Sequence, residues 1–149
     1  MASKIIGGVL LAMLMLVAAT NAEAIIVICF GSAGLVNGVQ TAQINVVRLE
    51  SPEPHLFCPA TLTFLDSHGD VIGQPTEVVF TRAGETLSAA FMGNPDVRIG
   101  VRLQIRAEAA IGNPDSSPGC RGSFVATLEL IDRLTRKTDV IQSLPIVRQ

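Results

Sequence analysis

One pattern of residues occurs twice in the chain and limits the folds open to it. Cys58 to Ile72 reads CPATLTFLDSHGDVI, and Ala126 to Ile141 reads ATLELIDRLTRKTDVI. In both segments an Ala-Thr-Leu sequence, an apolar alternation and an Asp lead through a polar turn into Asp-Val-Ile. Alternation with a period of two on either side of a turn is typical of a β-hairpin. The sequence therefore predicts two related hairpins.

Other segments also read as strands. Val97 to Ile105 alternates apolar and polar residues without an error, which predicts a strand with one buried face. Ile25 to Phe30 is a continuous apolar run and predicts a buried first strand. Thr41 to Leu49 alternates with a change of phase, which predicts a bulge near Val46.

Pro and Gly gather between these strands. Loops are predicted for Ser51 to Pro59 and for Gly112 to Gly119. No segment has the 3.6-residue period of an amphipathic helix. Seven to nine short strands separated by turns are typical of a β-sandwich, so the predicted fold class is all-β.

The first 24 residues read as a signal peptide rather than as part of the fold. Lys4 precedes an apolar run from Ile5 to Ala19, and Ala22-Glu23-Ala24 offers cleavage after Ala22 or Ala24. The mature chain, 25–149, then has the length of a single β-sandwich domain with no membrane span. An uncleaved anchor and a lipoprotein acylated at Cys29 are the less favoured alternatives. The predicted location is secreted or periplasmic.

Composition narrows the classes of partner. The formal net charge is −2, so the bulk charge suggests neither nucleic acid nor an anionic membrane surface, and only local charge matters. The chain has six Phe but no Trp or Tyr, which disfavours sugar-binding modules and tight protein interfaces. It contains no Asn-x-Ser/Thr sequence, in keeping with a bacterial exported protein.

Several segments together carry a resemblance to known proteins. They are Gly38-Val39-Gln40-Thr41 leading into Ile44-Asn45-Val46-Val47, Cys58-Pro59-Ala60-Thr61-Leu62-Thr63-Phe64-Leu65-Asp66, Ala83-Gly84-Glu85-Thr86 and Ala126-Thr127-Leu128-Glu129. The chain resembles small, signal-peptide-bearing bacterial proteins of unknown function with an immunoglobulin-like β-sandwich. The resemblance implies an antiparallel sandwich of seven to nine strands and export, and it brings no functional residues with it.

Three cysteines allow three disulfide pairings. Cys58 and Cys120 each precede an Ala-Thr-Leu strand and lie in loops containing Pro or Gly. If the two hairpins pack as related units, both cysteines lie at the same end of the sandwich. Cys29 lies inside an apolar run, where a thiol behaves as a small hydrophobe. We therefore predict a Cys58–Cys120 disulfide and a reduced, buried Cys29.

Few residues suggest catalysis or metal binding. Ser67, His68 and Asp66 can be written as a hydrolase triad, but neighbours in sequence rarely face one another as a triad requires. His55 and Cys58 have a ligand-like spacing that Cys29 and Cys120 could complete, but an oxidising compartment favours a disulfide over thiolate ligation of a metal. The Asp66–Asp70 segment lacks the closing Glu of a calcium loop. We predict no enzyme activity and no cofactor.

Arg98, Arg102 and Arg106 fall on one face of the strand predicted from Val97. They form a possible anion-binding stripe for polysaccharide, lipid head groups or nucleic acid. The alternative is that they pair across strands with acidic residues or protect a sheet edge from aggregation. The acidic candidates are Glu77, Glu85 and Glu129.

The predicted function is that of an exported, non-enzymatic β-sandwich module with a binding or structural role. Its partner would be a protein or another component of the cell envelope, and a monomer is favoured. The alternative is an assembly subunit in which Ile25 to Phe30 adds to a neighbour's sheet. A metal-binding protein or a hydrolase is less favoured.

Overall fold

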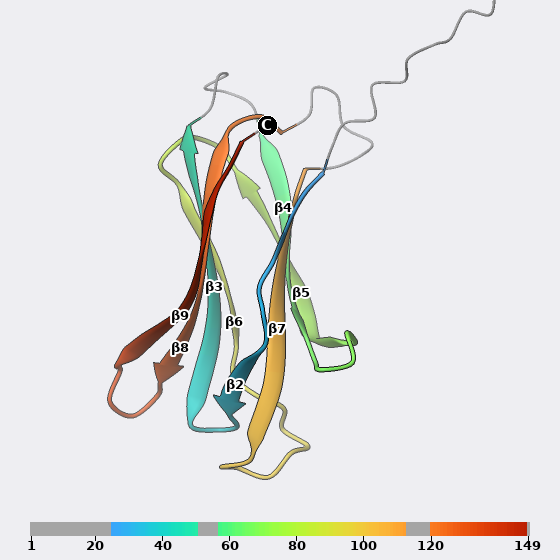
Figure 1. Ribbon diagram of the computed structural model, residues 1–149, viewed down its shortest axis with the longest axis vertical. Helices are drawn as coiled ribbons and strands as arrows, with labels where there is room; N and C mark the ends of the chain where they lie inside the picture. Colours follow the sequence, from blue (N-terminus) through green and yellow to red (C-terminus); the bar gives the residue numbers. More distant parts are fainter. Residues whose placement is uncertain (1–24, 51–56, 113–119, 149) are drawn as a thin grey trace, which may run out of the picture.

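The protein is a sandwich of two antiparallel β-sheets (Figure 1). The computed structural model describes residues 25–50, 57–112 and 120–148, so the predicted signal peptide lies outside the described residues. The described part contains nine strands and no helix, and accordingly no helix long and apolar enough to cross a membrane. The prediction of an all-β sandwich is confirmed. The immunoglobulin likeness stays a prediction.

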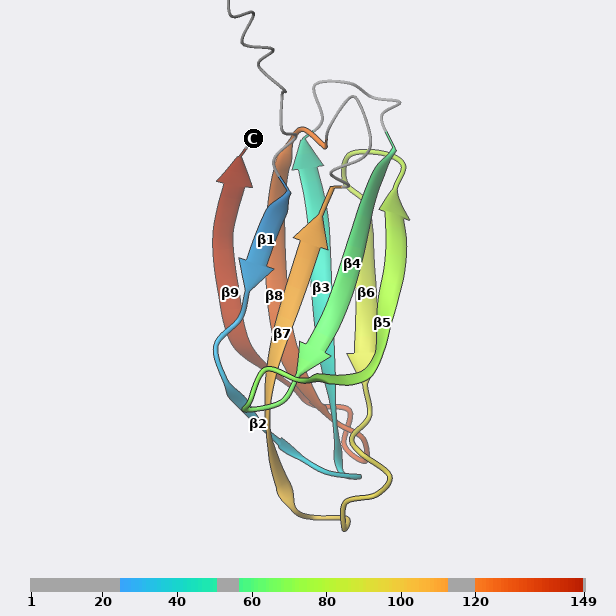
Figure 2. The ribbon, with the colours of Figure 1, turned by 90° about the vertical axis from the view of Figure 1, so that its right-hand side faces the viewer.

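The two sheets pack face to face, and Figure 2 looks onto the first sheet with the second behind it. The first sheet has the order β1-β7-β4-β5, and the short strand β2 also pairs with β7. Its strands are β1 (Ile26–Cys29), β2 (Ala33–Val36), β4 (Cys58–Leu65), β5 (Val71–Phe80) and β7 (Arg102–Ile111). The second sheet has the order β6-β3-β8-β9, formed by β3 (Gln40–Glu50), β6 (Thr86–Phe91), β8 (Ser123–Asp132) and β9 (Thr138–Arg148).

The two predicted hairpins are present as β4–β5 and β8–β9, one in each sheet. Their first strands match, because Ala60 and Ala126 begin the same buried alternation. The two Asp-Val-Ile segments do not match. Asp70 lies in the turn before β5, whereas Asp139 lies within β9 opposite Leu130. The sequence repeat is therefore structural up to the turn but not beyond it.

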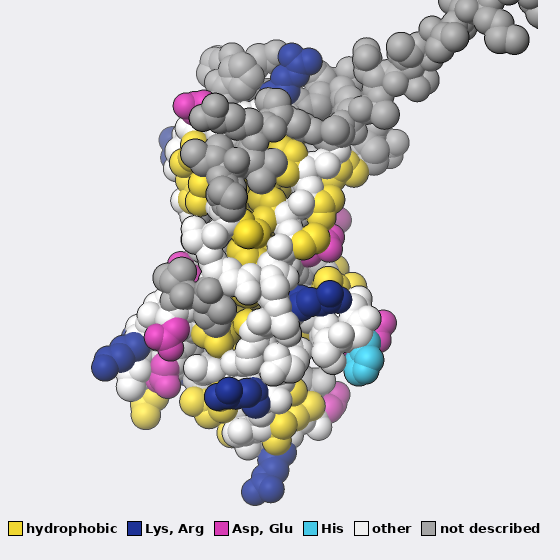
Figure 3. Space-filling view, in the orientation of Figure 1, with side chains coloured by type: hydrophobic (Ala, Val, Ile, Leu, Met, Phe, Trp, Pro, Cys, Tyr) yellow, Lys and Arg dark blue, Asp and Glu magenta, His cyan; other side chains and the backbone are white. Residues whose placement is uncertain are grey.

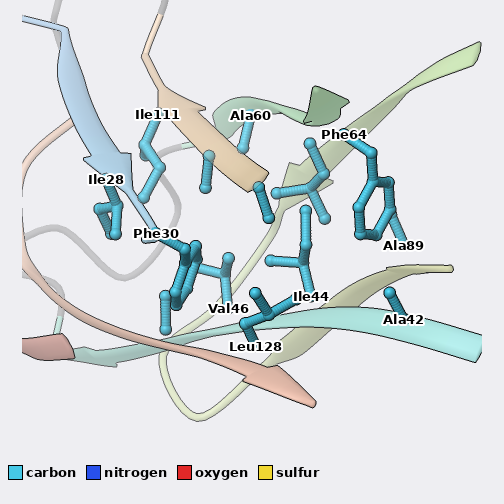
Figure 4. Packing of buried hydrophobic residues seen from close by; sticks show 14 of the residues in the cluster. Ile28, Phe30, Ala42, Ile44, Val46, Ala60, Phe64, Ala89, Ile111 and Leu128 are labelled. Atoms are coloured by element: carbon cyan, nitrogen blue, oxygen red, sulfur yellow. The ribbon is translucent and has the colours of Figure 1, made fainter. Parts of the chain in front are cut away.

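The core consists of the inward-facing residues of strands from both sheets (Figure 4). Because successive side chains of a strand point to opposite faces, every second residue is buried. Aromatic pairs cross the interior: the Phe64 and Phe91 ring centroids lie 5.6 Å apart, as do those of Phe80 and Phe124. These contacts join β4 to β6 and β5 to β8, so the same rings hold the two sheets together.

The first strand differs from its prediction. β1 is an edge strand that pairs only with β7, so Ile26 and Ile28 are buried while Val27 and Cys29 face solvent. The prediction of a buried Cys29 is therefore wrong, although the thiol is free as predicted. In a sandwich of two sheets each strand has one face toward the core and one outer face, and the apolar run does not reveal that Val27 and Cys29 lie on the outer one.

The alternation in β3 continues without the predicted change of phase. Val46 is followed on the inward face by Arg48, which is fully buried, while Leu49 is exposed. The register against β8 shifts only between Arg48 and Glu50. The prediction of a bulge near Val46 is wrong because an inward-facing arginine was read as an outward residue.

The strand predicted from Val97 begins later. Residues 92–101 form a connection, and β7 starts at Arg102 and continues to Ile111. Ile99 and Val101 are exposed rather than buried. Gly100 has a φ of +86°, a backbone conformation outside the β region. The sequence of residues 97–101 therefore has the alternation of a strand although their backbone forms a connection.

Candidate binding surface at the Asn37 end

Asn37 organises one end of the sandwich. Its side chain is buried, and its Nδ2 donates hydrogen bonds to the carbonyl oxygens of Asn94 and Val97 at 3.0 and 2.6 Å. Its Oδ1 accepts a hydrogen bond from the Asn94 N–H at 2.8 Å. The main chain of Asn37 bonds to Val101 and Gly100 at 2.8 and 2.9 Å. A buried amide with all its groups satisfied holds a loop in one conformation.

Three connections meet around this residue at the lower end of Figure 1. They are the β2–β3 turn (37–39), the β6–β7 connection (92–101) and the β8–β9 turn (133–137). The Arg133 N–H donates to the Val39 carbonyl at 2.9 Å, and Arg133 Nη1 donates to the Gly38 carbonyl at 3.4 Å. The β2–β3 turn is thus bonded to both other connections. We call this the Asn37 end.

Apolar side chains are exposed at the Asn37 end. Leu134 is 90% exposed, Ile99 74% and Met92 64%. Val39 and Val101 are also exposed there. Single apolar side chains on a surface are ordinary, but several on neighbouring loops form a patch of the kind found at interaction sites.

Basic side chains surround these apolar residues. Figure 3 shows dark blue and yellow side chains together at the lower end of the molecule. Five cations belong to these connections and the adjoining strand ends: Arg98, Arg102, Arg133, Arg136 and Lys137. Three carboxylates share the same segments: Asp96, Asp132 and Asp139. The local formal balance is positive although the whole chain carries −2.

The β8–β9 turn and the base of β3 enclose an open hollow of about 550 Å³. Its lining combines two guanidinium groups with two apolar side chains and comprises Gly38, Thr41, Met92, Arg133, Leu134 and Arg136. A hollow of this kind offers an anionic group two cations next to an apolar surface.

Asp132 shapes the turn that carries Leu134. Its Oδ1 accepts hydrogen bonds from the N–H groups of Thr135 and Leu134 at 2.7 and 2.9 Å and from the Thr135 hydroxyl at 3.0 Å. These bonds, those from Thr135 foremost, hold the pKa of Asp132 below its usual value. Asp132 is therefore charged, and its Oδ1 is directed into its own turn.

The structure separates the three arginines of the predicted anion-binding stripe. Arg102 and Arg106 lie on β7, but Arg98 lies in the β6–β7 connection, so the prediction of one strand face is wrong for Arg98. The Arg106 guanidinium lies against Gly69 in the β4–β5 turn. Arg98 and Arg102 instead join the cations of the Asn37 end. Sequence reasoning missed the grouping because Met92 and Leu134 lie in connections that are far apart in the chain.

The Ser67, His68 and Asp66 side chains do not form a catalytic triad. His68 is 82% exposed, and its Nδ1 lies 3.4 Å from the Ser67 hydroxyl and 3.6 Å from an Asp66 carboxylate oxygen. In a triad the base uses one ring nitrogen for the nucleophile and the other for the carboxylate. Here both partners approach the same nitrogen, so no proton path runs through the ring.

A disulfide cross-links the opposite end of the sandwich. Cys58 and Cys120 are bonded, as predicted, with Cα atoms 5.2 Å apart. Cys58 is the first residue of β4, so the loop prediction is wrong for Cys58 and Pro59. The disulfide also removes Cys58 as a thiolate ligand, and His55 lies outside the described residues. Among the described residues no group of three or more His, Cys, Asp or Glu could hold a metal.

Arg48 lies at the same end as the disulfide. Its Nη2 donates to the Arg121 carbonyl at 3.0 Å, one residue after Cys120. Its main-chain N–H and carbonyl bond to Glu85 and Gly84 at 3.1 and 2.6 Å. Burial lowers the pKa of the Arg48 guanidinium, and the Glu85 carboxylate partly opposes that effect. Arg48 thus ties the β5–β6 turn to the segment entering β8.

Comparison of the chain with protein-family models, with curated proteins and with solved structures finds no match.

Proposed function

We propose that this protein is an exported, non-enzymatic binding module of the bacterial cell envelope, secreted or periplasmic. It docks through the Asn37 end onto a membrane surface that contains anionic lipid. The observation that carries this proposal is the presence of exposed Leu134, Ile99 and Met92 among five cations on neighbouring connections.

Export is supported by the Cys58–Cys120 disulfide. Structural disulfides persist in oxidising compartments and are rare where thiols are kept reduced. The Lys4-containing n-region and the apolar run after it are typical of a signal peptide. Both observations favour a location outside the cytoplasm.

An anionic lipid surface fits both halves of the patch. Aliphatic side chains at loop tips leave water when they enter the acyl boundary of a membrane, which stabilises binding by roughly 0.8 kcal/mol per buried CH₂. A basic residue near an anionic leaflet contributes about 1 kcal/mol, and the two effects add when apolar tips and cations share one end. Arginine side chains can also keep their charged ends among the head groups while their stems cover apolar atoms.

Other occupants fit less well. The Asn37 end has no aromatic ring for stacking against sugars or bases, because the chain has no Trp or Tyr and the connections contain no Phe. Nucleic acid would use the cations but leave Leu134 and Ile99 in water. The assembly alternative is not favoured either, since β1 pairs with β7 of its own chain and buries Ile26 and Ile28 there.

Sedimentation with lipid vesicles tests the proposal. The protein should pellet with vesicles of phosphatidylcholine and phosphatidylglycerol, and pellet weakly with phosphatidylcholine alone. Added salt should weaken binding because it screens the cations. Replacing Leu134, Ile99 and Met92 together by Ser should reduce binding by about tenfold or more. A matched control replaces Val27 on β1 and Val79 on β5, which are exposed towards the disulfide end.

Two outcomes would refute the lipid assignment. One is equal binding to neutral and anionic vesicles, and the other is a triple variant that binds as well as the control. A photo-crosslinking side chain at position 134 in exporting cells then identifies the alternative. Adducts with a protein rather than with lipid would replace the membrane surface by a protein partner at the same end.

A further inference from the structure

The pairing of strands follows one scheme twice. We divide the strands into a first unit, β1 to β5, and a second unit, β6 to β9. With β2 left aside, each unit has four strands. The first strand of each unit pairs with the second strand of the other unit: β1 pairs with β7, and β6 pairs with β3. On their other sides β7 pairs with β4 and β3 with β8, the third strands, which pair in turn with the last strands, β5 and β9. Exchanging the two units leaves the scheme unchanged, with β2 as an addition to the first unit.

The register of the strands repeats as well. Three rows of inward residues cross β1, β7 and β4, and three matching rows cross β6, β3 and β8. The rows of the first sheet are Ile26-Ile111-Ala60, Ile28-Ala109-Leu62 and Phe30-Ala107-Phe64. The matching rows of the second sheet are Leu87-Val46-Ala126, Ala89-Ile44-Leu128 and Phe91-Ala42-Leu130.

The first and third pairs of matching rows have similar side chains, whereas in the second pair the Ile and the Ala exchange strands. The third row of each sheet contains a Phe at the end of the edge strand or one residue beyond it, with an Ala opposite: Phe30 with Ala107, and Phe91 with Ala42. All of these side chains are buried. A strand that slipped by one residue would put its inward set in solvent, so register is strongly specified and is not shared by chance between arbitrary strand pairs.

The turns after the third strands also correspond. Asp66 Oδ1 accepts hydrogen bonds from the N–H groups of His68 and Asp70 at 2.8 and 3.0 Å. Asp132 occupies the equivalent position, six residues after Ala126, and accepts from the N–H groups of its own turn in the same way. Both carboxylates close an Asx-type turn at the end of an Ala-Thr-Leu strand.

We infer that the chain is a tandem duplication of one four-strand unit. The two units fold as a pseudo-dimer in which β3 of the first unit lies in the sheet of the second, and β7 of the second unit lies in the sheet of the first. The surface that joins the units is self-complementary, as in a two-fold homodimer with exchanged strands. The partner that each unit fits is therefore a second copy of the same unit, here supplied by the same chain. The Cys58–Cys120 disulfide crosses between the two units.

The duplication separates shared residues from specialised ones. The rows and the turn aspartates are common to both units, so they serve folding. The turn of the first unit continues from Asp66 with Ser67, His68 and Gly69, whereas that of the second unit is longer and carries Leu134 among basic residues. The features proposed for membrane docking thus lie mostly where the second unit departs from the first.

Exchanging one row between the sheets tests the inference in the full chain. The double variant I28A/A109I moves the large side chain within the first sheet, and I44A/A89I does so in the second. Each double variant changes the row of one sheet and leaves the facing row of the other sheet unchanged. In the quadruple variant each sheet carries the Ile and Ala arrangement of the other sheet, so the two rows should again fit each other. Its thermal midpoint should therefore exceed that of either double variant. A quadruple variant less stable than both doubles would overturn the equivalence.

A circular permutant tests it independently, and decides the matter if none of the row variants folds. The chain is opened between Arg82 and Ala83, and β9 is joined to β1 by a copy of the Thr81–Glu85 sequence, which links β5 to β6 in the native chain. We expect the Cys58–Cys120 disulfide to form and the thermal midpoint to shift by less than about 5 °C. The same permutant joined by Gly84-Glu85 alone should be much less stable. Failure of the permutant with the copied connection to fold refutes the duplication, and vesicle binding is scored separately.

Discussion

Cys58 and Cys120 lie 5.2 Å apart at their Cα atoms and join the first strand of one hairpin to the segment that enters the other. Because the two hairpins belong to different sheets, this disulfide crosses the sandwich. The third cysteine, Cys29, lies on an exposed edge strand and has no disulfide partner.

Removing the disulfide should cost much of the stability. The sequence separation of the two cysteines is 62, and closing a loop of that length stabilises a fold by about 4 kcal/mol in the chain-entropy model. We expect C58A/C120A to lose about that amount in the free energy of unfolding by urea. Cys29→Ser is the control and should change it by less than about 0.5 kcal/mol. A double variant as stable as the native protein would contradict this account.

Replacing Asn37 by Ala should loosen the Asn37 end. The substitution leaves the Val97 carbonyl and the Asn94 N–H without their side-chain partner, whereas the Asn94 carbonyl keeps the Val97 N–H at 3.1 Å. Leaving two such part-buried groups unpaired costs about 2 kcal/mol in the free energy of unfolding. Faster amide hydrogen exchange in residues 94–101 is the local measure. Asn94→Ala is the control, because it keeps the main-chain partners of Asn37. A loss of unfolding free energy as large as that of the Asn37 variant would show that the Asn37 side chain does not organise this end.

Arg48→Ala should destabilise the disulfide end. The change opens a cavity at a fully buried position and deprives the Arg121 carbonyl of a donor. We expect a loss of about 3 kcal/mol in the free energy of unfolding, measured by chemical denaturation. Arg82→Ala removes an exposed arginine from the neighbouring turn and should cost less than about 0.5 kcal/mol. Equal losses in the two variants would show that burial of Arg48 is not the cause.

Stability should fall in acid. Hydrogen bonds from main-chain N–H groups hold the pKa values of Asp66 and Glu85 below their usual 3.8 and 4.5. A carboxyl group whose pKa is lower in the folded chain stabilises it above the usual pKa, and this contribution is lost as the pH falls through the folded value. The urea midpoint should thus decline as the pH drops below about 4.5. Replacing Asp66 by Asn should flatten that decline, and an unchanged slope would contradict the prediction.

Much of the core could be predicted from local pattern. Leu62 and Phe64, and likewise Leu128 and Leu130, alternate with polar residues and point inward as the period of two requires. The disulfide pairing followed from the place of each cysteine ahead of its strand. The candidate site was not predicted as a group, because Ile99 and Leu134 lie in segments distant in sequence that share no local pattern.

By itself the sequence determined the strand character, the inward residues of most strands and the repetition of the hairpin, because these depend on the conformation of neighbouring residues. Only the tertiary structure decided which strands lie at an edge, where β7 begins and that Arg48 is buried. These depend on contacts between segments far apart in the chain: β1 lies at an edge because it pairs only with β7, and Asn37 binds the main chain of residues 94–101, which precede β7. The exchange of strands between the two units is likewise visible only in that pairing.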